Sequence, residues 1–500
     1  MAVVAAGLHW GTFAAGGSDS YCYVHQAEGW AAGRLQVVEP LALEAPWPDP
    51  PLTFAPAGHI PSPAVRGAAA PICPAGLSIA MVPFVYAGAA FRRPDAMFAV
   101  VPLFGALLVW SVYLLGSRFS QRVGLASALL VACSPAFLFQ LMQPMSDVPA
   151  AALWVLAAAV ATSGRPRAPL LAGLVTSAAI LMRPNLLPMG VVLGLSFLPR
   201  CAGAATFAAA SAPGCIAVAL IQQMFYGSPF RSGYGTLEGL FAFDHVVPNA
   251  IRYATWMWQS HTPIWLVALA APFVLPRRLT GLLLSLAAVN VLCYLPYAVF
   301  NDWWYVRFLL PGIAIVLVLV TAVIDALAHL WREPSWLAQR TSHEGLSHRF
   351  VVAALTIALS AFFIRQAQAR SVFDLQRLEA RYGRAGAYVA EHLPPNALVI
   401  TSWESGSVRF YGHRNTLVWD GLDPAWLDRA IAYTRTRGLE PYLLFERWEE
   451  PIFRQRFAGS DTGKLDWPPA AEIAGQVRIY RPDDRARYFR GEAAPTEYAR

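Results

Sequence analysis

The chain has 500 residues, of which 56% are hydrophobic and 14% are charged, whereas charged residues make up about a quarter of an ordinary soluble protein. This composition argues against a soluble protein with a single core. The charges are also unevenly placed, since 37 of the 69 lie in the 131 residues from Arg370 to Arg500. The sequence therefore predicts an apolar body, residues 1–369, and a water-soluble tail, residues 370–500.

The first stretch, MAVVAAGLHWGTFAAGG, is apolar but has no basic region and no convincing cleavage site, so it is a poor signal peptide. About 15 residues give roughly 22 Å of helix, less than the roughly 30 Å of hydrocarbon in a bilayer. We therefore expect either a span that is tilted against partner helices or, as the favoured interpretation, a first span that the start of the sequence has shortened.

Eleven further apolar segments follow, several of them shorter than the roughly 20 residues of a simple span. We assign the first to the membrane interface and the other ten, with the short first stretch, to membrane crossing. The predicted fold is therefore mainly α: a polytopic transmembrane helical bundle of about 11 spans plus interfacial helices. The segments are 71–90, 95–115, 123–141, 148–162, 169–182, 185–199, 201–221, 263–275, 279–300, 308–330 and 350–368.

Two long polar loops, 16–70 and 222–262, interrupt the apolar body. With 71–90 at the interface, ten arginines fall on one side and four on the other, which places both loops and the tail outside the cytoplasm. Because the arginines stand in short clusters between apolar segments, they indicate orientation and not nucleic-acid binding. The ten are Arg118, Arg122, Arg165, Arg167, Arg200, Arg277, Arg278, Arg332, Arg340 and Arg349, and the four are Arg92, Arg93, Arg183 and Arg307.

The tail has the pattern of a small α/β domain. NALVIT, PYLLFE and VRIYRP are short apolar runs typical of strands, and DPAWLDRAIAYTRTRG has an Asp cap, helical spacing and a closing Gly. No Gly-rich phosphate loop follows these strands, which argues against a nucleotide-binding domain. We therefore predict a transmembrane domain over 1–369 and a soluble extracytoplasmic α/β domain over 370–500.

The cysteines and histidines show no metal-binding spacing, so we predict no metal site, although a divalent metal remains an option. Cys22 and Cys73 flank the first polar loop and could pair in an oxidising compartment, but the sequence does not fix their separation. Asp244, His245 and His261 are interpreted as loop residues. The other four cysteines lie in or beside apolar segments.

Two acids stand where apolar segments meet the outer side. Asp19 lies in GGSDSYCYVHQAEGWAAGRL, backed by Tyr21 and Tyr23, and could take a proton from a hydroxyl nucleophile. Asp147 lies in QPMSDVPAAALW, on the same side in the predicted topology, and an ionisable group at a membrane boundary is a candidate functional residue. The alternative for both is an ordinary helix start, where Asp serves as a cap.

Arg183 and Arg307 lie at outer helix ends, against the orientation rule for positive charge. A bound phosphate would explain them, because the guanidinium fork matches phosphate oxygens. The alternatives are contact with lipid headgroups or, for Arg307, pairing with Asp302. Aromatic residues at this side form an interfacial belt. Aromatic faces also stack on sugars, but the sequence does not show which ring would do so. Tyr21 and Tyr305 are kept as candidate substrate-binding residues.

Four segments resemble the GT-C superfamily of multi-pass glycosyltransferases, in particular the enzymes that depend on polyprenyl- or dolichyl-phosphate sugars, such as protein O-mannosyltransferases and lipid A aminoarabinose transferases. Their order and spacing cover roughly residues 1–330, and the tail is similar to the outer domains of bacterial members. The segments are GGSDSYCYVHQAEGWAAGRL, SPAFLFQLMQPMSDVPAAALWVLA, GLVTSAAILMRPN and WWYVRFLLPGIAI.

The resemblance implies that Asp19 is the catalytic acid of the first outer loop and Asp147 the second acid. It also implies that Arg307, and less firmly Arg183, hold the phosphate of the donor. The donor would be a polyprenyl-phosphate sugar, the displacement would invert the anomeric centre, and no metal would be obligatory. A basic or acidic residue that many members carry later in the first loop has no clear match here.

These features predict a bacterial inner-membrane enzyme that moves a sugar from a polyprenyl phosphate to a hydroxyl of a carbohydrate, lipid or protein acceptor at the outer face, without cofactor or nucleic acid. One alternative is a transporter or flippase of a lipid-linked intermediate, which would place ionisable residues in the middle of helices. Another is a non-catalytic scaffold whose tail binds a partner.

Overall fold

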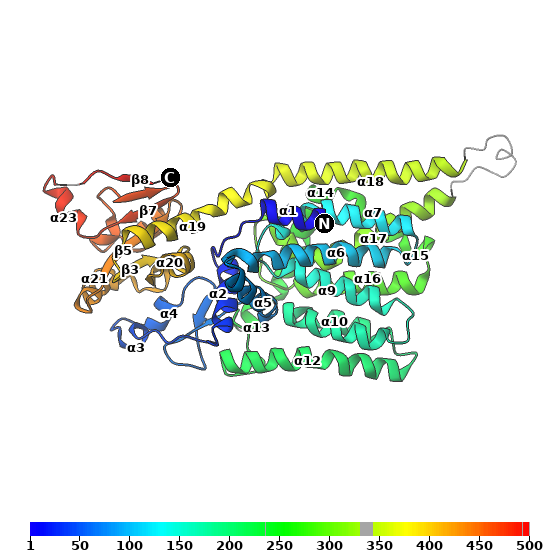
Figure 1. Ribbon diagram of the computed structural model, residues 1–500, viewed down its shortest axis with the longest axis horizontal. Helices are drawn as coiled ribbons and strands as arrows, with labels where there is room; N and C mark the ends of the chain where they lie inside the picture. Colours follow the sequence, from blue (N-terminus) through cyan, green and yellow to red (C-terminus); the bar gives the residue numbers. More distant parts are fainter. Residues whose placement is uncertain (236, 331–343, 493, 500) are drawn as a thin grey trace. The chain divides into compact units, whose positions relative to one another are not determined.

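The computed structural model describes residues 1–235, 237–330, 344–492 and 494–499 (Figure 1), and 67% of these described residues are helical. Chain contacts divide it into two compact units. The helix unit comprises Met1–Gly11, Phe98–Ala219 and Gly235–Leu375, and the sheet unit comprises Thr12–Met97, Leu220–Tyr234 and Gln376–Arg500. Of the arginines used for orientation, Arg332 and Arg340 lie outside the described residues.

The helix unit is a bundle of antiparallel helices joined by short turns and 3-10 segments (Figure 1). Its helices are α1 (Ala2–Trp10), α6 (Val100–Gly116), α7 (Gln121–Cys133), α8 (Pro135–Leu141), α9 (Asp147–Ala161), α10 (Ala168–Met182), α11 (Leu187–Leu195), α12 (Cys201–Tyr226), α14 (Val246–His261), α15 (Ala271–Val274), α16 (Arg277–Tyr294), α17 (Leu310–Leu330) and α18 (Glu344–Ala369).

Among the described residues, five helices are long and apolar enough to cross a membrane, and a sixth span results if α7 and α8 are counted as one. The predicted count of about 11 is not confirmed. Several predicted segments form shorter helices, and the segment at 123–141 bends by 60° between α7 and α8. The break lies at Ser134–Pro135, where the Ser134 hydroxyl accepts from the Phe137 amide and proline begins a new helix.

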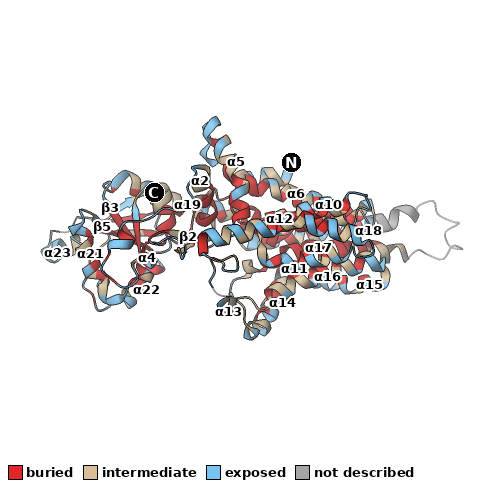
Figure 2. Cartoon of the chain, turned by 90° about the horizontal axis from the view of Figure 1, so that it is seen from below, coloured by how far each residue is buried: buried red, intermediate tan, exposed pale blue. Residues whose placement is uncertain are grey.

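Helix α17 belongs to the most deeply buried long apolar stretch among the described residues. In that stretch, Trp303–His329, 89% of the most apolar part is buried, compared with 17% in α12 (Figure 2). Small residues let neighbouring helices approach closely. A Cβ on Gly116 of α6 would lie 2.9 Å from the Cα of Gly124 in α7, as is typical of helix packing within membranes. Helices α6 and α7 therefore approach closely at Gly116 and Gly124.

The sheet unit contains a six-stranded mixed sheet of order β4-β3-β5-β7-β6-β8, in which β3 is parallel to both β4 and β5. Its elements are α2 (Asp19–Ala31), α3 (Leu41–Glu44), α4 (Pro50–Phe54), β1 (His59–Pro61), β2 (Ala69–Pro71), α5 (Ala75–Phe91), α19 (Leu375–His392), β3 (Ala397–Thr401), α20 (Ser405–Gly412), β4 (Asn415–Val418), α21 (Leu427–Thr436), β5 (Glu440–Glu446), α22 (Glu449–Arg456), β6 (Ala471–Ile473), β7 (Val477–Tyr480), α23 (Asp484–Phe489) and β8 (Glu497–Ala499).

The elements predicted in the tail are confirmed. NALVIT, PYLLFE and VRIYRP contain β3, β5 and β7, and the predicted helix contains α21. Asp423 caps the turn before α21 by accepting from the Ala425 amide at 2.8 Å, and Gly438 follows the helix with φ of 75°. Strands β4 (four residues), β6 and β8 (three residues each) were not predicted.

The first polar loop contributes to the core of this sheet. Trp47 and Phe54 from the loop pack with Leu398 of β3 and Leu443 of β5 in one hydrophobic cluster. The backbone carbonyl of Phe54 also accepts a hydrogen bond of 2.9 Å from Arg409 in α20. The loop and the tail are therefore one folded body, although more than 300 residues separate them in the sequence.

Candidate active site

Asp147 and Arg183 form a buried ion pair in the helix unit. Asp147 is the first residue of α9, and its Oδ1 lies 2.6 Å from Nη2 of Arg183. Arg183 follows α10 in an extended conformation because a residue before proline avoids the helical region. The Asp147 side chain is fully buried, and that of Arg183 is 14% exposed. The carboxylate thus binds a guanidinium and does not cap its own helix.

Tyr294, the last residue of α16, completes this contact. Its hydroxyl accepts a hydrogen bond of 2.9 Å from Nη1 of Arg183. The end of α16 is itself fixed by Asn249 of α14, whose amide donates to the carbonyls of Leu295 and Tyr297 at 3.0 and 2.6 Å. The guanidinium is therefore held by a carboxylate on one side and a phenol on the other.

Arg307 joins the same cluster through Phe308. The guanidinium carbons of Arg183 and Arg307 each lie 5.3 Å from the centre of the Phe308 ring. Arg307 also lies 5.1 Å from the ring of Tyr305, which stacks on Phe300 at 3.9 Å. Tyr305, Arg307 and Phe308 belong to η5 (Trp303–Leu309), the 3-10 segment that precedes α17.

Asn290 fixes the junction between η5 and α17. Its side-chain amide donates to the Phe308 carbonyl at 3.2 Å, and its carbonyl accepts from the Gly312 amide at 2.9 Å. Asn290 is fully buried in α16. Its two hydrogen bonds supply partners for the Phe308 carbonyl and the Gly312 amide at the junction between the 3-10 segment and the α-helix, where backbone groups can lack helical partners. Four predicted residues thus meet at one end of the bundle: Asp147, Arg183, Tyr305 and Arg307.

Asp19 lies in the sheet unit, partly exposed, as the first residue of α2. Ser18 occupies the cap position, without a side-chain cap bond, so the predicted alternative of an Asp cap is not what forms here. The preceding turn contains Gly17 with φ of 56°, a conformation that glycine adopts at little cost.

The C-terminal part of the sheet unit holds the turn before Asp19 tightly. The Ala15 amide donates to the Tyr411 hydroxyl at 2.9 Å. A Cβ on Gly16 would lie 2.0 Å from Cδ2 of Tyr382, so no other residue fits without movement. Tyr382 lies on α19, where the neighbouring Arg381 donates to its hydroxyl at 2.9 Å.

Arg381 in turn ties this tyrosine to the sheet. Its Nε lies 3.1 Å from Oε2 of Glu446, the last residue of β5, and its Nη1 lies 3.1 Å from Glu379. Burial raises the pKa of Glu379, and burial raises the pKa of nearby Glu404 to about 8. The ion pairs of Arg381 with Glu446 and Glu379 thus anchor the residue against which the Asp19 turn packs.

Tyr21 does not line an open site. Its side chain is fully buried, and a Cβ on Gly406 of α20 would lie 2.4 Å from its ring. The ring stacks on His25 at 5.0 Å, and His25 contacts His59 at 3.3 Å. Burial raises the pKa of Tyr21 to about 12 and lowers the pKa of His25 to about 4. Tyr21 is thus packed inside the sheet unit, and its contact with substrate stays a prediction.

Cys22 and Cys73 form a disulfide across the first loop, which settles the pairing that the sequence left open. The bond joins α2 to the segment before α5, and the Ser78 hydroxyl of α5 donates to the Tyr23 carbonyl at 2.9 Å. Segment 71–90, predicted to lie at the interface, thus forms a helix that packs on α2 within the sheet unit.

Within the described ranges, no three His, Cys, Asp or Glu side chains are grouped as metal ligands. His261, interpreted from the sequence as a loop residue, is instead fully buried at the end of α14. Its ring nitrogens contact the hydroxyls of Ser134 and Ser260, both at 2.8 Å. The helical spacing of Tyr253 and Trp256 could have indicated this helix within the predicted loop 222–262.

Sequence reasoning missed Tyr294 and Asn290 in this site. Tyr294 ends an apolar segment in which aromatic residues are common, and Asn290 is a single polar residue in a long apolar run. The polarity of Asn290 was the available signal, because a buried amide in a membrane helix needs partners.

Comparison with protein-family models and with curated proteins finds no match. Solved structures do match. ArnT from Cupriavidus metallidurans bound to undecaprenyl phosphate has a TM-score of 0.56 at 11% identity, over 99% of this chain and 98% of that chain. The Archaeoglobus fulgidus oligosaccharyltransferase in the apo form has a TM-score of 0.55 at 15% identity, over 93% and 72%.

The arabinofuranosyltransferase AftD from Mycobacteria has a TM-score of 0.51 at 15% identity, over 96% of this chain and 41% of that chain. All three are GT-C glycosyltransferases. The long apolar helices among the described residues have the length and composition of membrane spans. The chain therefore has the fold of the GT-C glycosyltransferases, which confirms the fold that its sequence resemblance implies.

Proposed function

We propose that this protein is a membrane glycosyltransferase that moves a sugar from a polyprenyl-phosphate donor to an acceptor hydroxyl. The fold supports the proposal, since the matched ArnT structure contains undecaprenyl phosphate. A structure of the Archaeoglobus fulgidus enzyme AglB, with a TM-score of 0.54 at 14% identity, contains an inhibitory peptide and a dolichol-phosphate. The donor is therefore proposed to be a lipid phosphate that carries the sugar.

The observation that carries the proposal is the convergence of Arg183 and Arg307 on the Phe308 ring. Two guanidinium groups beside the same aromatic ring suit a phosphate, whose oxygens accept paired N–H donors. Asp147 and Tyr294 fix the orientation of Arg183, so its donors need little rearrangement when the donor phosphate binds. Fixed donors of this kind stabilise the charge that grows on a leaving phosphate.

Asp19 is assigned the role of general base by its resemblance to the catalytic acid of the first outer loop. In an inverting displacement, the acceptor oxygen attacks the anomeric carbon while the bond from that carbon to the phosphate oxygen breaks. The hydroxyl proton passes to the Asp19 carboxylate, and the lipid phosphate leaves with the bonding electrons. The partial exposure of Asp19 suits a base that an acceptor must reach. Tyr305 is assigned to the donor side, beside Arg307.

The reaction is proposed to take place at the outer face of the bacterial inner membrane. The Cys22–Cys73 disulfide supports this placement, because such bonds form in oxidising compartments and are rare in the cytosol. The disulfide and the C-terminal sheet belong to one unit, so the C-terminal sheet is proposed to lie outside the cytoplasm as well.

The test is sugar transfer by the purified protein in lipid vesicles, from a radiolabelled polyprenyl-phosphate sugar. We expect Asp19→Asn to abolish transfer while membrane insertion and thermal unfolding stay unchanged. Asp49→Asn is the matched control in the same loop: Asp49 is exposed and has φ of 49°, which Asn tolerates. Near-normal transfer by Asp19→Asn would exclude Asp19 as the base. Movement of intact donor across the vesicle without transfer would favour a flippase instead.

A further inference from the structure

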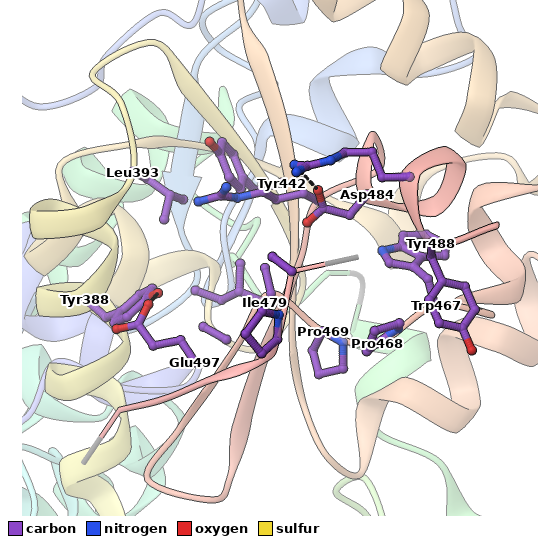
Figure 3. A pocket seen from close by; sticks show the side chains of 16 residues that line it. Tyr388, Leu393, Tyr442, Trp467, Pro468, Pro469, Ile479, Asp484, Tyr488 and Glu497 are labelled. Atoms are coloured by element: carbon purple, nitrogen blue, oxygen red, sulfur yellow. Dashed lines mark hydrogen bonds and ion pairs between the residues drawn. The ribbon is translucent and has the colours of Figure 1, made fainter. Parts of the chain in front are cut away.

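The sheet unit contains a pocket of about 200 Å³ beside strands β6, β7 and β8 (Figure 3). Its walls come from α19, from the segment that leads into β6, and from α23. This volume is below the roughly 300–1,000 Å³ of pockets for drug-sized ligands, so it suits a group of about one six-membered ring. None of the residues proposed for transfer lines it.

Aromatic side chains form two opposite walls. In Figure 3, Tyr388 lies on one side of the pocket, and Trp467 and Tyr488 lie on the other. Trp467 is 4% exposed and Tyr488 is 43% exposed, so one forms the inner wall and the other the outer rim. The faces of aromatic rings pack on apolar surfaces without requiring a charged partner. The C–H face of a pyranose is such an apolar surface.

The polar lining has no net formal charge. Arg481, Arg487, Asp484 and Glu497 all line the pocket, which gives two cations and two anions. Nη1 of Arg487 lies 3.4 Å from Oδ1 of Asp484, and the Tyr388 hydroxyl donates to Oε2 of Glu497 at 2.8 Å. Such a lining offers both donors and acceptors to hydroxyl groups. The two carboxylates work against a phosphate or another anion.

We propose that this pocket binds a neutral monosaccharide unit, with its ring between the aromatic walls and its hydroxyls on the charged groups. An acyl chain would displace water from the charged groups and offer them no hydrogen bonds in exchange, which is costly. Binding here requires no transfer chemistry. The further step, that the pocket selects a carbohydrate-bearing acceptor, rests on the proposed glycosyltransferase function.

The test is saturation-transfer NMR with the full-length protein in lipid nanodiscs. Glycoside detergents are avoided because their sugar headgroups would compete for the pocket. The probes are D-glucose, D-mannose, D-galactose, N-acetyl-D-glucosamine and L-arabinose, each measured alone, and D-glucuronate as an anionic comparison. We expect at least one neutral sugar to bind and to bind more strongly than glucuronate.

Two variants test the location. Tyr488→Ala removes the outer wall, and we expect at least a tenfold weaker affinity for the sugar that binds. Phe489→Ala is the matched control, since Phe489 is the next residue of α23, is 62% exposed and does not line the pocket; its affinity should equal that of the unmodified protein. Asp484→Asn keeps the size of the side chain but makes the pocket cationic. This variant should strengthen the binding of glucuronate relative to the binding of the neutral sugar.

The proposal is overturned if no neutral sugar binds the folded protein, if glucuronate binds best, or if Tyr488→Ala and Phe489→Ala bind alike. These results are independent of donor turnover. If the protein binds sugar through Tyr488 but transfers none, the proposal for the pocket stands and the proposed function is refuted. If the protein transfers sugar but fails the binding tests, the proposed function stands and the proposal for the pocket is refuted.

Discussion

The turn before Asp19 offers a stereochemical test of the claim that the C-terminal part of the sheet unit positions the base. A Cβ on Gly16 would lie 2.0 Å from Cδ2 of Tyr382, whereas carbon atoms pack at about 3.5–4.0 Å. Gly16→Ala must therefore displace the turn or the ring by roughly 1.5 Å, and a misplacement of about 1 Å can cost about a hundredfold in rate. We expect kcat to fall about a hundredfold with a smaller change in donor KM.

Combining Gly16→Ala with Tyr382→Ala provides the decisive comparison. The double variant lacks the ring that the added methyl group would strike, so its kcat should be no lower than that of Tyr382→Ala alone. This non-additivity is the signature of two residues in contact. Gly383→Ala is the control on the same helix, because a Cβ there meets nothing within 4 Å. An unchanged kcat in Gly16→Ala would contradict this contact. So would a double variant in which adding Gly16→Ala to Tyr382→Ala lowers kcat as much as Gly16→Ala lowers it alone.

Three further predictions concern stability. Arg183→Gln leaves the buried Asp147 carboxylate without its cation, at a cost of about 3–5 kcal/mol that thermal unfolding would show. Adding Asp147→Asn should restore most of that stability without restoring transfer, and a double variant no more stable than Arg183→Gln would contradict the pairing. Replacing Cys22 and Cys73 by Ala removes a link across 51 residues. In the chain-entropy account, this lowers the free energy of unfolding by about 4 kcal/mol. Alkylation of both thiols in unreduced protein would instead show that no disulfide forms. Glu404, whose pKa burial raises to about 8, keeps a proton in the folded chain that the unfolded chain releases. The stability that this bound proton gives the folded chain is therefore lost as pH rises toward and through about 8. Between about pH 6.5 and about pH 9, the unfolding temperature of Glu404→Gln should fall less than that of the unmodified protein. Equal falls in the two proteins would contradict this prediction.

The sequence was sufficient to predict the helical bundle and the strands β3, β5 and β7, because apolar spacing is a local property of the chain. The number of spans was not predictable in the same way. Proline and short polar breaks, such as Ser134–Pro135, divide apolar runs that composition alone reads as continuous. Hydropathy detects these runs but not the angle between their halves.

The site was predictable in its residue types but not in its pairings. Asp147, Arg183 and Arg307 were found from charges in unfavourable places, yet the bond from Asp147 to Arg183 and the role of Tyr294 depend on how α9, α10 and α16 pack. The union of the first loop with the C-terminal sheet was missed for the same reason. Contacts such as that of Gly16 with Tyr382 join residues far apart in the sequence, and no periodic pattern reports them.

The most direct test of the central claim separates donor binding from donor cleavage in one single-turnover experiment. Excess protein in vesicles is mixed with a radiolabelled polyprenyl-phosphate sugar and an acceptor, and bound donor and released lipid phosphate are followed together. We predict that Asp19→Asn binds the donor normally but releases no lipid phosphate, and that Arg307→Gln weakens donor binding at least tenfold. Normal release by Asp19→Asn, or unchanged donor binding by Arg307→Gln, would contradict the assignment of base and phosphate site.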